Sequence, residues 1–385
     1  MSKLAKKISL LVKILLFYVV TFVLGLVIPK RKDLVVITAS KGKYYNGNAK
    51  ALFEYLLTRD DLEAYYSTSK KELFNKLSKE ESNVIYHYSR KGLWLFLRAR
   101  TVCITHGHAD FFGFFPSLWQ NWVYLGHGIG TKARLFLRER MSLSERIQTI
   151  LSRTCVYIAT SDFTRYLLCA TYHIKAKKVF VTGYPRTDVL YKNRKIGSEI
   201  TQHNILYAPT HREGGVTQLF PFEDFNISRL TEFLRSKGLS LNVRFHPNNY
   251  KKSKREIGTI LNSSKLIKDK SPDVVEDPQD LLLSAEVLIT DFSSVSRDYL
   301  FLDRPMIFIM NGVDDLGKLP APMRPEFVFC GYQVRTYEEL EEALREILEG
   351  KDRFAELRKF VRDLTYNYFD DKTSMRVVEL IKELA

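Results

Sequence analysis

An apolar strand, a polar turn and the beginning of a helix follow one another in VLITDFSSVSRD, residues 287–298. Residues 287–289 are apolar and favour a β-strand, and residues 300–302 continue the helix. Ser293 and Ser294 can cap this helix, whose N-terminal N–H groups and partial positive charge bind phosphate well. Serine caps are also common in ordinary α/β proteins, so the stretch alone leaves a phosphate site as one of two interpretations.

Apolar strand-like runs alternate with helical runs from residue 33 onward. The first series of expected strands covers residues 34–38, 84–88, 102–105, 122–125, 156–159 and 179–181. The second series covers residues 205–207, 242–245, 265–267, 287–289, 306–309 and 327–329. This alternation predicts an α/β protein with parallel sheets, helices on both faces and ligands bound beyond the carboxyl ends of the strands.

The length of 385 residues allows about two domains, each with its own core. The polar stretch 192–203 separates the two strand series, so we expect doubly wound Rossmann-type domains over residues 33–195 and 196–385. A last helix, at about residues 354–384, is long enough to cross back onto the first domain. Residues 1–32 form a separate segment.

Lysines precede the apolar part of this N-terminal segment: Lys3, Lys6, Lys7 and Lys13 come before or at the start of an uncharged run over residues 14–28. The run is shorter than the roughly 20 residues that a membrane span needs, and no small-residue cleavage site follows it. We therefore expect a membrane-associating helix, either a signal anchor or a helix embedded in one leaflet with its lysines at anionic headgroups. A helix buried in the core is the third interpretation.

The chain is strongly basic, with a formal net charge of +15. Such an excess favours anionic partners, whether nucleic acid, an anionic membrane surface or a phosphate-rich substrate. Lys and Arg are spread along the chain, and no zinc spacing, RNP-type motif or long basic helix occurs, so the sequence does not favour nucleic acid. The four cysteines form no CxxC pair, which fits a reducing compartment.

A histidine between two glycines follows the expected strand 122–125, in the sequence GHGIGTK of residues 126–132. Glycine permits unusual backbone torsions and close approach of a ligand. An imidazole at a strand end can transfer a proton near neutral pH, so His127 is a candidate for that chemistry. A turn histidine without a role is the other interpretation. Lys132 and Arg134 follow, and either can meet phosphate or stay solvated.

Cationic side chains also stand at three further strand ends. Arg244 and His246 are two residues apart in RFHP, so an extended strand points both to one side, as an anion clamp requires. The two other strand ends present Arg186, Thr210, His211 and Arg212. Each of these segments taken alone is also a common type of surface loop.

Two histidines, His106 and His108, stand close together in the sequence THGH and invite a metal-site interpretation. Protein metal sites draw several ligands from His, Cys and carboxylates at characteristic spacings. Asp110 is the one such partner at ligand spacing, so the sequence does not favour a metal.

Taken in order, these segments resemble the CDP-glycerol glycerophosphotransferase family, the teichoic-acid primases and polymerases. The resemblance covers roughly residues 34–385 and begins weakly at YNGNAKAL, residues 45–52. It is carried by GHGIG at 126–130, GYPRTD at 183–188, YAPT at 207–210, RFHP at 244–247 and LITDFSS at 288–294, followed by RPMIF at 304–308. One such motif is weak, whereas five in the right order are specific.

The resemblance implies a GT-B-like fold, with two Rossmann-type domains facing a cleft that holds the active site. It implies transfer of glycerol phosphate or ribitol phosphate from CDP-glycerol or CDP-ribitol to an acceptor hydroxyl, with release of CMP and without an obligatory metal or other cofactor. We expect a lipid-linked saccharide as acceptor and a teichoic-acid-like or capsular polymer as product. With a cytosolic nucleotide as donor, the expected location is the cytoplasmic face of the cell membrane.

The resemblance also implies which residues carry the reaction. His127 would act as general base on the acceptor hydroxyl or hold the reacting phosphate, and His246 would stabilise the pyrophosphate beside Arg244. Phosphoryl transfer needs positioning and charge neutralisation more than covalent chemistry, which cationic side chains and a helix N-terminus can supply.

The donor site implied by the resemblance lies mainly in the second domain. Ser293, Ser294 and the helix behind them would bind donor phosphate, and Asp298 would reach a donor hydroxyl. The other residues expected at this site are Gly128, Ile129, Gly130, Arg186, Thr210, His211 and Phe245. Three positions depart from the family's pattern, namely Thr131, His211 and Glu213. The long N-terminal extension of the polymerases is also missing, which favours a single-addition enzyme.

Two other functions stay open. A nucleotide-sugar glycosyltransferase on the same fold would be expected to carry a C-terminal acidic residue for the ribose, and its product would be UDP rather than CMP. A non-catalytic, membrane-bound scaffold would have no need of His127 and His246, and the presence of both argues against it.

Overall fold

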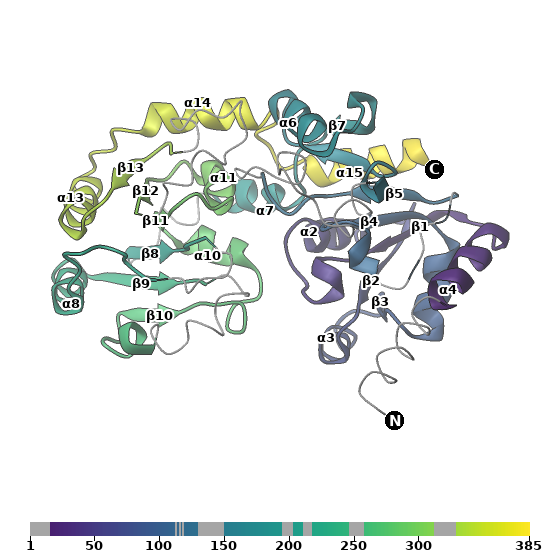
Figure 1. The fold of residues 1–385 in the computed structure, drawn as a ribbon, viewed down its shortest axis with the longest axis horizontal. Coiled ribbons are helices and arrows are strands. Elements are labelled where there is room, and N and C mark those ends of the chain that lie inside the picture. The colour runs from purple at the N-terminus through teal and green to yellow at the C-terminus, as the bar shows by residue number, and fades with distance from the viewer. Residues whose placement is uncertain are drawn as a thin grey trace.

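Two parallel sheets organise the chain, with helices packed on their faces (Figure 1). The computed structural model describes residues 16–111, 114, 117, 119–129, 150–194, 203–210, 218–245, 258–311 and 329–385. Every strand pairing within these residues is parallel. The prediction of an α/β protein with two parallel sheets is thereby confirmed.

The first sheet has the strand order β3-β2-β1-β4-β5-β6-β7. Its strands are β1 (Arg31–Ile37), β2 (Glu63–Thr68), β3 (Val84–Tyr86), β4 (Ala99–Ile104), β5 (Asn121–Tyr124), β6 (Val156–Ala159) and β7 (Val179–Val181). Residues 34–37 of β1 are fully buried, as expected of a central strand covered on both faces. The sequence did not predict β2, because Glu63, Ser67 and Thr68 interrupt its apolar pattern.

The second sheet has the order β10-β9-β8-β11-β12-β13. Its strands are β8 (His203–Tyr207), β9 (Leu239–Val243), β10 (Ile267–Asp269), β11 (Val287–Thr290), β12 (Met306–Ile309) and β13 (Tyr332–Val334). The last strand was expected at 327–329, a segment of which residues 327 and 328 lie outside the described residues. Phe329 and Cys330 are buried, so the apolar character there reflects packing in the core just before β13.

Helices cover both sheets and form the remaining layers. Those before residue 200 are α2 (Gly47–Leu56), α3 (Lys71–Leu77), α4 (Arg90–Arg98), α6 (Asp162–Tyr172) and α7 (Arg186–Asn193). Those after it are α8 (Ile227–Ser236), α10 (Pro278–Ser284), α11 (Val295–Tyr299), α13 (Tyr337–Leu348), α14 (Ala355–Thr365) and α15 (Thr373–Leu384). Capping boxes begin α6 and α13, where Ser161 and Thr336 accept backbone N–H groups.

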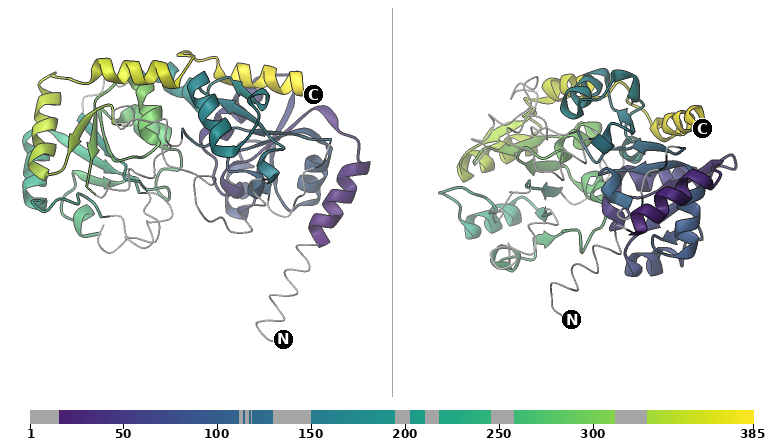
Figure 2. Two further views of the ribbon diagram at one scale, coloured as in Figure 1. Left: turned by 45° about the horizontal axis from the view of Figure 1, so that its top comes forward. Right: turned by 45° about the vertical axis from the view of Figure 1, so that its right-hand side comes forward.

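The expected single C-terminal helix is two helices, α14 and α15, with a bend between them. Both run along the same side of the molecule, α14 over the second sheet and α15 over the first (Figures 1 and 2). The carboxylate of Asp188 accepts the backbone N–H groups of Thr373 and Ser374 at 2.9 and 2.8 Å, which fixes the start of α15. A helix N-terminus favours such an acceptor, so the chain end is tied to the first domain.

Residues 16–27 form a helix at the outer end of the first domain (Figure 2). Its inner face packs on the core: Thr21 is fully buried, and the Ser117 hydroxyl donates to the Gly25 carbonyl at 2.7 Å. Lys30 closes the contact by donating to the carbonyls of Gly25 and Leu97. Within the described part of the chain, none of the helices combines the length and the apolar character that a membrane crossing requires.

Candidate active site

A cleft of about 660 Å³ lies where loops of the two domains meet. Its walls follow the carboxyl ends of β1, β4 and β5 in the first sheet and of β8, β9 and β11 in the second. Parallel sheets place their strand ends together, so this is the location expected for a ligand site. His127, Arg186, Arg244, Ser294 and Asp298 are all among the residues that line it.

Two glycines shape the loop that carries His127. Gly126 and Gly128 have φ values of +67° and +152°, which other residues rarely adopt. A Cβ at Gly126 would lie 2.9 Å from the Tyr184 hydroxyl, and one at Gly128 would lie 2.9 Å from the Ser294 hydroxyl. The first domain's histidine loop therefore touches the second domain's serine turn, and the glycines make this close approach possible.

The hydrogen bonds of His127 fix which ring nitrogen carries the proton. Its Nδ1 lies 3.1 Å from the Thr105 carbonyl oxygen, and the Tyr124 hydroxyl lies 3.5 Å from the same nitrogen. A carbonyl oxygen can only accept, so Nδ1 carries the hydrogen and Nε2 is the basic nitrogen. The ring is thus set up to accept a proton at Nε2, as a general base does.

A second imidazole supports the first. The rings of His106 and His127 are stacked, with centroids 4.2 Å apart and an angle of 12° between their planes. The His106 Nδ1 lies 2.7 Å from the Thr105 hydroxyl. Sequence reasoning considered His106 only as a metal ligand, and its place beside His127 could have been suspected only because each follows a neighbouring strand of the sheet.

The carboxylate of Asp110 holds this corner of the cleft together. It accepts the backbone N–H groups of Thr105 and His106 at 2.7 and 2.8 Å, and that of Lys41 at 2.7 Å. His108 does not join the two stacked histidines: its ring centroid lies 4.6 Å from that of Trp122. Burial lowers the pKa of His108 to about 4. Within the described residues no group of His, Cys, Asp and Glu side chains is arranged to hold a metal.

Ser293 and Ser294 precede α11, as the sequence predicted, although the helix is shorter than expected. It runs from Val295 to Tyr299 and continues as a 3-10 turn, η6 (Leu300–Leu302). Ser294 is the N-cap residue, but its side chain makes no capping hydrogen bond. Both hydroxyls line the cleft, and the Ser294 hydroxyl faces the Gly128 backbone.

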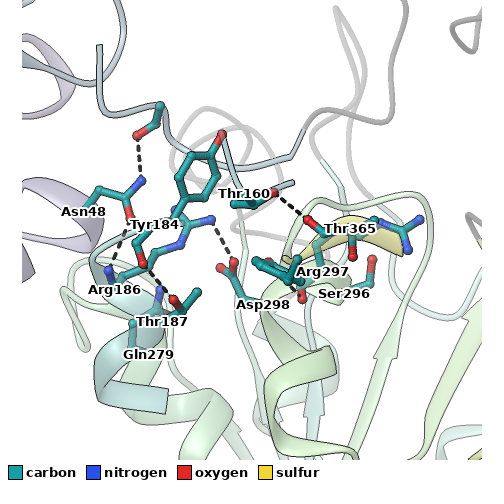
Figure 3. A network of polar contacts seen from close by, with 12 residues as sticks. Asn48, Thr160, Tyr184, Arg186, Thr187, Gln279, Ser296, Arg297, Asp298 and Thr365 are labelled. Atoms are coloured by element: carbon teal, nitrogen blue, oxygen red, sulfur yellow. Dashed lines mark hydrogen bonds and ion pairs between the residues drawn. The ribbon is translucent and has the colours of Figure 1, made fainter. Parts of the chain in front are cut away.

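An ion pair crosses the cleft floor between the domains. Arg186 Nη2 donates to Asp298 Oδ1 at 2.8 Å, and both side chains are 7% exposed (Figure 3). Burial raises the pKa of the Asp298 carboxyl above its usual range, and the Arg186 charge only partly offsets this effect. The pair joins α7 of the first domain to α11 of the second.

Asn48 links this pair to the histidine loop. Its side-chain N–H groups donate to the carbonyls of Leu125 and Gly126 at 2.8 and 3.0 Å. Its side-chain oxygen accepts the backbone N–H of Arg186 at 3.3 Å (Figure 3). Asn48 is 2% exposed, so one buried amide links the loop that carries His127 to the backbone of Arg186. Apart from the position of Asn48 in the weak YNGN motif, nothing in the amino-acid pattern indicates this role.

Two expected donor-site residues are engaged with the protein itself. Arg244 donates to the carbonyls of Lys270, Val275 and Glu276, which braces the loop before α10, and burial lowers the pKa of Arg244 to about 10. The backbone N–H and the hydroxyl of Thr210 both donate to the Asp291 carboxylate.

Other expected site residues are buried or lie outside the described part of the chain. Phe245 lines the cleft although it is only 1% exposed and packs in the core of the second sheet, and Ile129 is 3% exposed. Gly130, His211 and His246 lie outside the described residues, as do Lys132 and Arg134.

The model of one protein family, described as CDP-Glycerol:Poly(glycerophosphate) glycerophosphotransferase, matches residues 20–383. The chain belongs to this family. It is therefore an enzyme of the CDP-glycerol glycerophosphotransferase type. The family resemblance stated from the motifs is confirmed, and the match includes both sheets.

Individual relatives within the glycerophosphotransferase family agree with this assignment. A teichoic acid glycerol-phosphate transferase of Staphylococcus aureus is 24% identical over 91% of this chain and 93% of its own length. A teichoic acid poly(glycerol phosphate) polymerase of Bacillus spizizenii is 25% identical over 80% of each chain. The structure of a variant of the wall teichoic acid polymerase TagF covers 92% of this chain and 89% of its own, with a TM-score of 0.72 and 18% identity. The fold is thus close to that of TagF, as the GT-B-like resemblance implied.

Proposed function

We propose that this enzyme transfers glycerol phosphate from CDP-glycerol to a hydroxyl group of its acceptor and releases CMP. His127 Nε2 takes the proton of the acceptor hydroxyl, whose oxygen attacks the glycerol-bearing phosphorus. The bond between that phosphorus and the bridging oxygen breaks, and CMP leaves with the bridging oxygen. The observation that carries the proposal is the contact of the two halves of the site, where the His127 loop meets Ser294 across the cleft.

The second domain supplies hydroxyl groups that would contact the negatively charged phosphates of the donor. The hydroxyls of Ser293 and Ser294 line the cleft, and the Ser294 side chain makes no capping hydrogen bond that would occupy it. Donors of this kind stabilise the charge that develops on phosphate oxygens during transfer. Arg186 of the first domain also lines the cleft, where its charge is shared with Asp298 at 2.8 Å.

The choice of glycerol phosphate over ribitol phosphate rests on how the relatives align. The glycerol-phosphate transferase and the polymerase of Bacillus spizizenii match over 93% and 80% of their own lengths. A poly(ribitol-phosphate) polymerase of the same organism matches over only 57% of its length. The structure of a TagF variant after a soak with CDPG also resembles this chain, at 17% identity. These comparisons support CDP-glycerol as donor.

The experiment compares CDP-glycerol, CDP-ribitol and a UDP-sugar as donors, with membranes supplying the acceptor, and measures the nucleotide released. We expect CMP from CDP-glycerol and at least 100-fold less from the His127→Ala variant, because loss of a general base typically costs about 10²–10⁴ in rate. His173→Ala, which changes an exposed histidine on α6's C-terminus, serves as control. Release of UDP alone would favour the glycosyltransferase, and no release from any donor would favour a scaffold.

We also propose that the enzyme works on a lipid-linked saccharide at the cytoplasmic face of the cell membrane, with the helix of residues 16–27 lying in the plane of the leaflet. The outward side of this helix carries six apolar residues that are 40–71% exposed: Leu16, Val19, Val20, Val23, Leu26 and Val27. A continuous exposed stripe of this kind is typical of an interaction surface. The docked inner face, with its buried Thr21 and Gly25, favours a helix on the surface over one that spans.

Flotation with vesicles of anionic and of zwitterionic phospholipid tests this location. The Val20→Asp/Val23→Asp variant is expected to stay unbound, because it places two charges on the outward face. Val274→Asp alters a valine of the second domain that is more exposed, at 59%, and should float like the wild type. Flotation of the double variant at wild-type level would contradict the proposal. If the wild type forms a dimer and the double variant does not, the exposed stripe is instead a contact with a second copy of the chain.

A further inference from the structure

Three consecutive residues after β1 have left-handed backbone torsions. Ser40, Lys41 and Gly42 have φ values of +50°, +62° and +71°. This region is strained for residues other than glycine, so Ser40 and Lys41 adopt it only because the surroundings impose it. Gly42 has no alternative, since a Cβ there would lie 2.6 Å from the Ser69 nitrogen.

The strained turn is held by the same groups that hold the base. Ser40 N–H donates to the Thr105 hydroxyl at 3.1 Å, and Lys41 N–H donates to Asp110 at 2.7 Å. Thr105 also accepts His127 Nδ1–H through its carbonyl oxygen, and Asp110 also accepts the backbone N–H of His106. The turn and the histidine pair are therefore parts of one framework.

This turn presents two lysines to the cleft. Lys41 and Lys43 are exposed and line the cleft on the side of the first domain. The nearby Lys50 pairs with Asp277 at 3.3 Å, whereas in the described part of the chain neither Lys41 nor Lys43 has an ion-pair partner. Strained backbone held in place by its surroundings is found often at binding sites, and here it carries two lysines that line the same cleft as His127.

We propose that Lys41 and Lys43 bind a phosphate group of an anionic acceptor and hold the acceptor hydroxyl near His127 Nε2. This inference rests on the proposed function and adds the chemistry of the second substrate. In the proposed function the donor phosphates contact Ser293 and Ser294 of the second domain, so the lysines of the first domain are assigned to the acceptor. A lysine ammonium is a compact charge with three donors, so it can contact a phosphate group in more than one orientation.

The first test measures binding of inorganic pyrophosphate by isothermal titration, with saturating CMP present. The wild type and the Lys177→Gln variant, which removes an exposed lysine of the first domain outside the cleft, should bind equally. The Lys41→Gln/Lys43→Gln variant should bind at least tenfold more weakly. Equal binding by all three proteins, or no binding by the wild type, overturns the proposal.

The second test measures transfer from CDP-glycerol to glycerol 3-phosphate and to glycerol, which differ only in the phosphate. Each Lys→Gln change should lower kcat/KM for glycerol 3-phosphate about tenfold, as expected for one charge-assisted hydrogen bond, and leave transfer to glycerol unchanged. Equal losses with both acceptors would assign the lysines to the donor and overturn the inference. If the wild type releases no CMP while pyrophosphate binding still requires the two lysines, the proposed function fails and the anion site stands.

Discussion

His106 and His127 lie ring on ring, with centroids 4.2 Å apart and planes within 12° of each other. The two histidines follow different strands, β4 and β5, which pair in parallel and so bring their ends together. Stacking fixes the plane of the His127 ring, and the Thr105 carbonyl fixes its tautomer. In the proposed mechanism His106 is therefore a positioning residue for His127, and the two contributions can be tested separately.

Replacing His106 tests the stack. His106→Ala should lower kcat about tenfold, because the His127 ring loses one of its supports, and a displaced group can cost more than that in rate. His106→Phe keeps a flat ring over His127 and should recover most of the loss. The pH profile of kcat is the deciding readout. An unchanged profile in His106→Phe agrees with positioning, and a displaced one would make His106 part of the proton transfer.

Variants of the Arg186–Asp298 ion pair can distinguish its contribution to stability from its contribution to activity. Removing either partner alone leaves a buried charge, which typically costs about 3–5 kcal/mol in the free energy of unfolding. The Arg186→Leu/Asp298→Leu variant removes both charges and should recover most of that stability, while transfer from CDP-glycerol stays impaired. Urea denaturation and CMP release measure the two quantities. Full activity in the double variant would show that the pair only holds the domains together.

Stability should fall at acidic pH because of His87. This imidazole is 1% exposed beside Phe111, and burial lowers its pKa to about 3. As the pH falls below about 6.5, the unfolded chain binds a proton that the folded protein refuses, so stability present at neutral pH is lost. Between pH 7 and 4.5 the loss from this residue is about 2–3 kcal/mol. His87→Phe keeps the ring contacts, so the free energy of unfolding, measured by urea denaturation, should fall by that much less between pH 7 and 4.5. The same pH dependence in the variant and the wild type would refute the assignment.

Lys41→Gly should separate backbone strain from charge. Glycine adopts a φ of +62° freely, whereas a residue with a side chain pays about 1 kcal/mol or more there. The gain offsets the greater freedom of glycine in the unfolded chain, so thermal unfolding should show no loss of stability. Transfer to a phosphate-bearing acceptor should nevertheless fall as in Lys41→Gln. A marked drop in melting temperature would mean that Lys41 is a structural residue.

The sequence was informative about strands, because parallel strands buried on both faces are short apolar runs. β11 and the Ser293-Ser294 turn were located for that reason, and His127 was found because glycines flank it at a strand end. β2 was not predicted, since Glu63 and Thr68 interrupt the apolar pattern of a strand that lies between β1 and β3. The family followed from motif order rather than from any one motif.

The relations between residues could not be predicted from one sequence. Arg186 and Asp298 are 112 positions apart, and nothing in either segment indicates the pairing. The sequence places Asn48 in a helix, but it does not show that the Asn48 side-chain amide joins two loops. Lys41 and Lys43 were recognised as candidate phosphate ligands only from the structure, because nothing in the sequence predicts the left-handed φ values at Ser40 and Lys41.

The most direct measurement follows the phosphorus. CDP-glycerol labelled with ³²P on the glycerol-bearing phosphate is incubated with enzyme and membranes, and label is counted in the acceptor and nucleotide fractions. We expect the label to enter the acceptor in an amount equal to the unlabelled CMP released, and His127→Ala to abolish both. Label that stays with the nucleotide as CDP, or leaves as inorganic phosphate with acceptor present, would contradict glycerol-phosphate transfer.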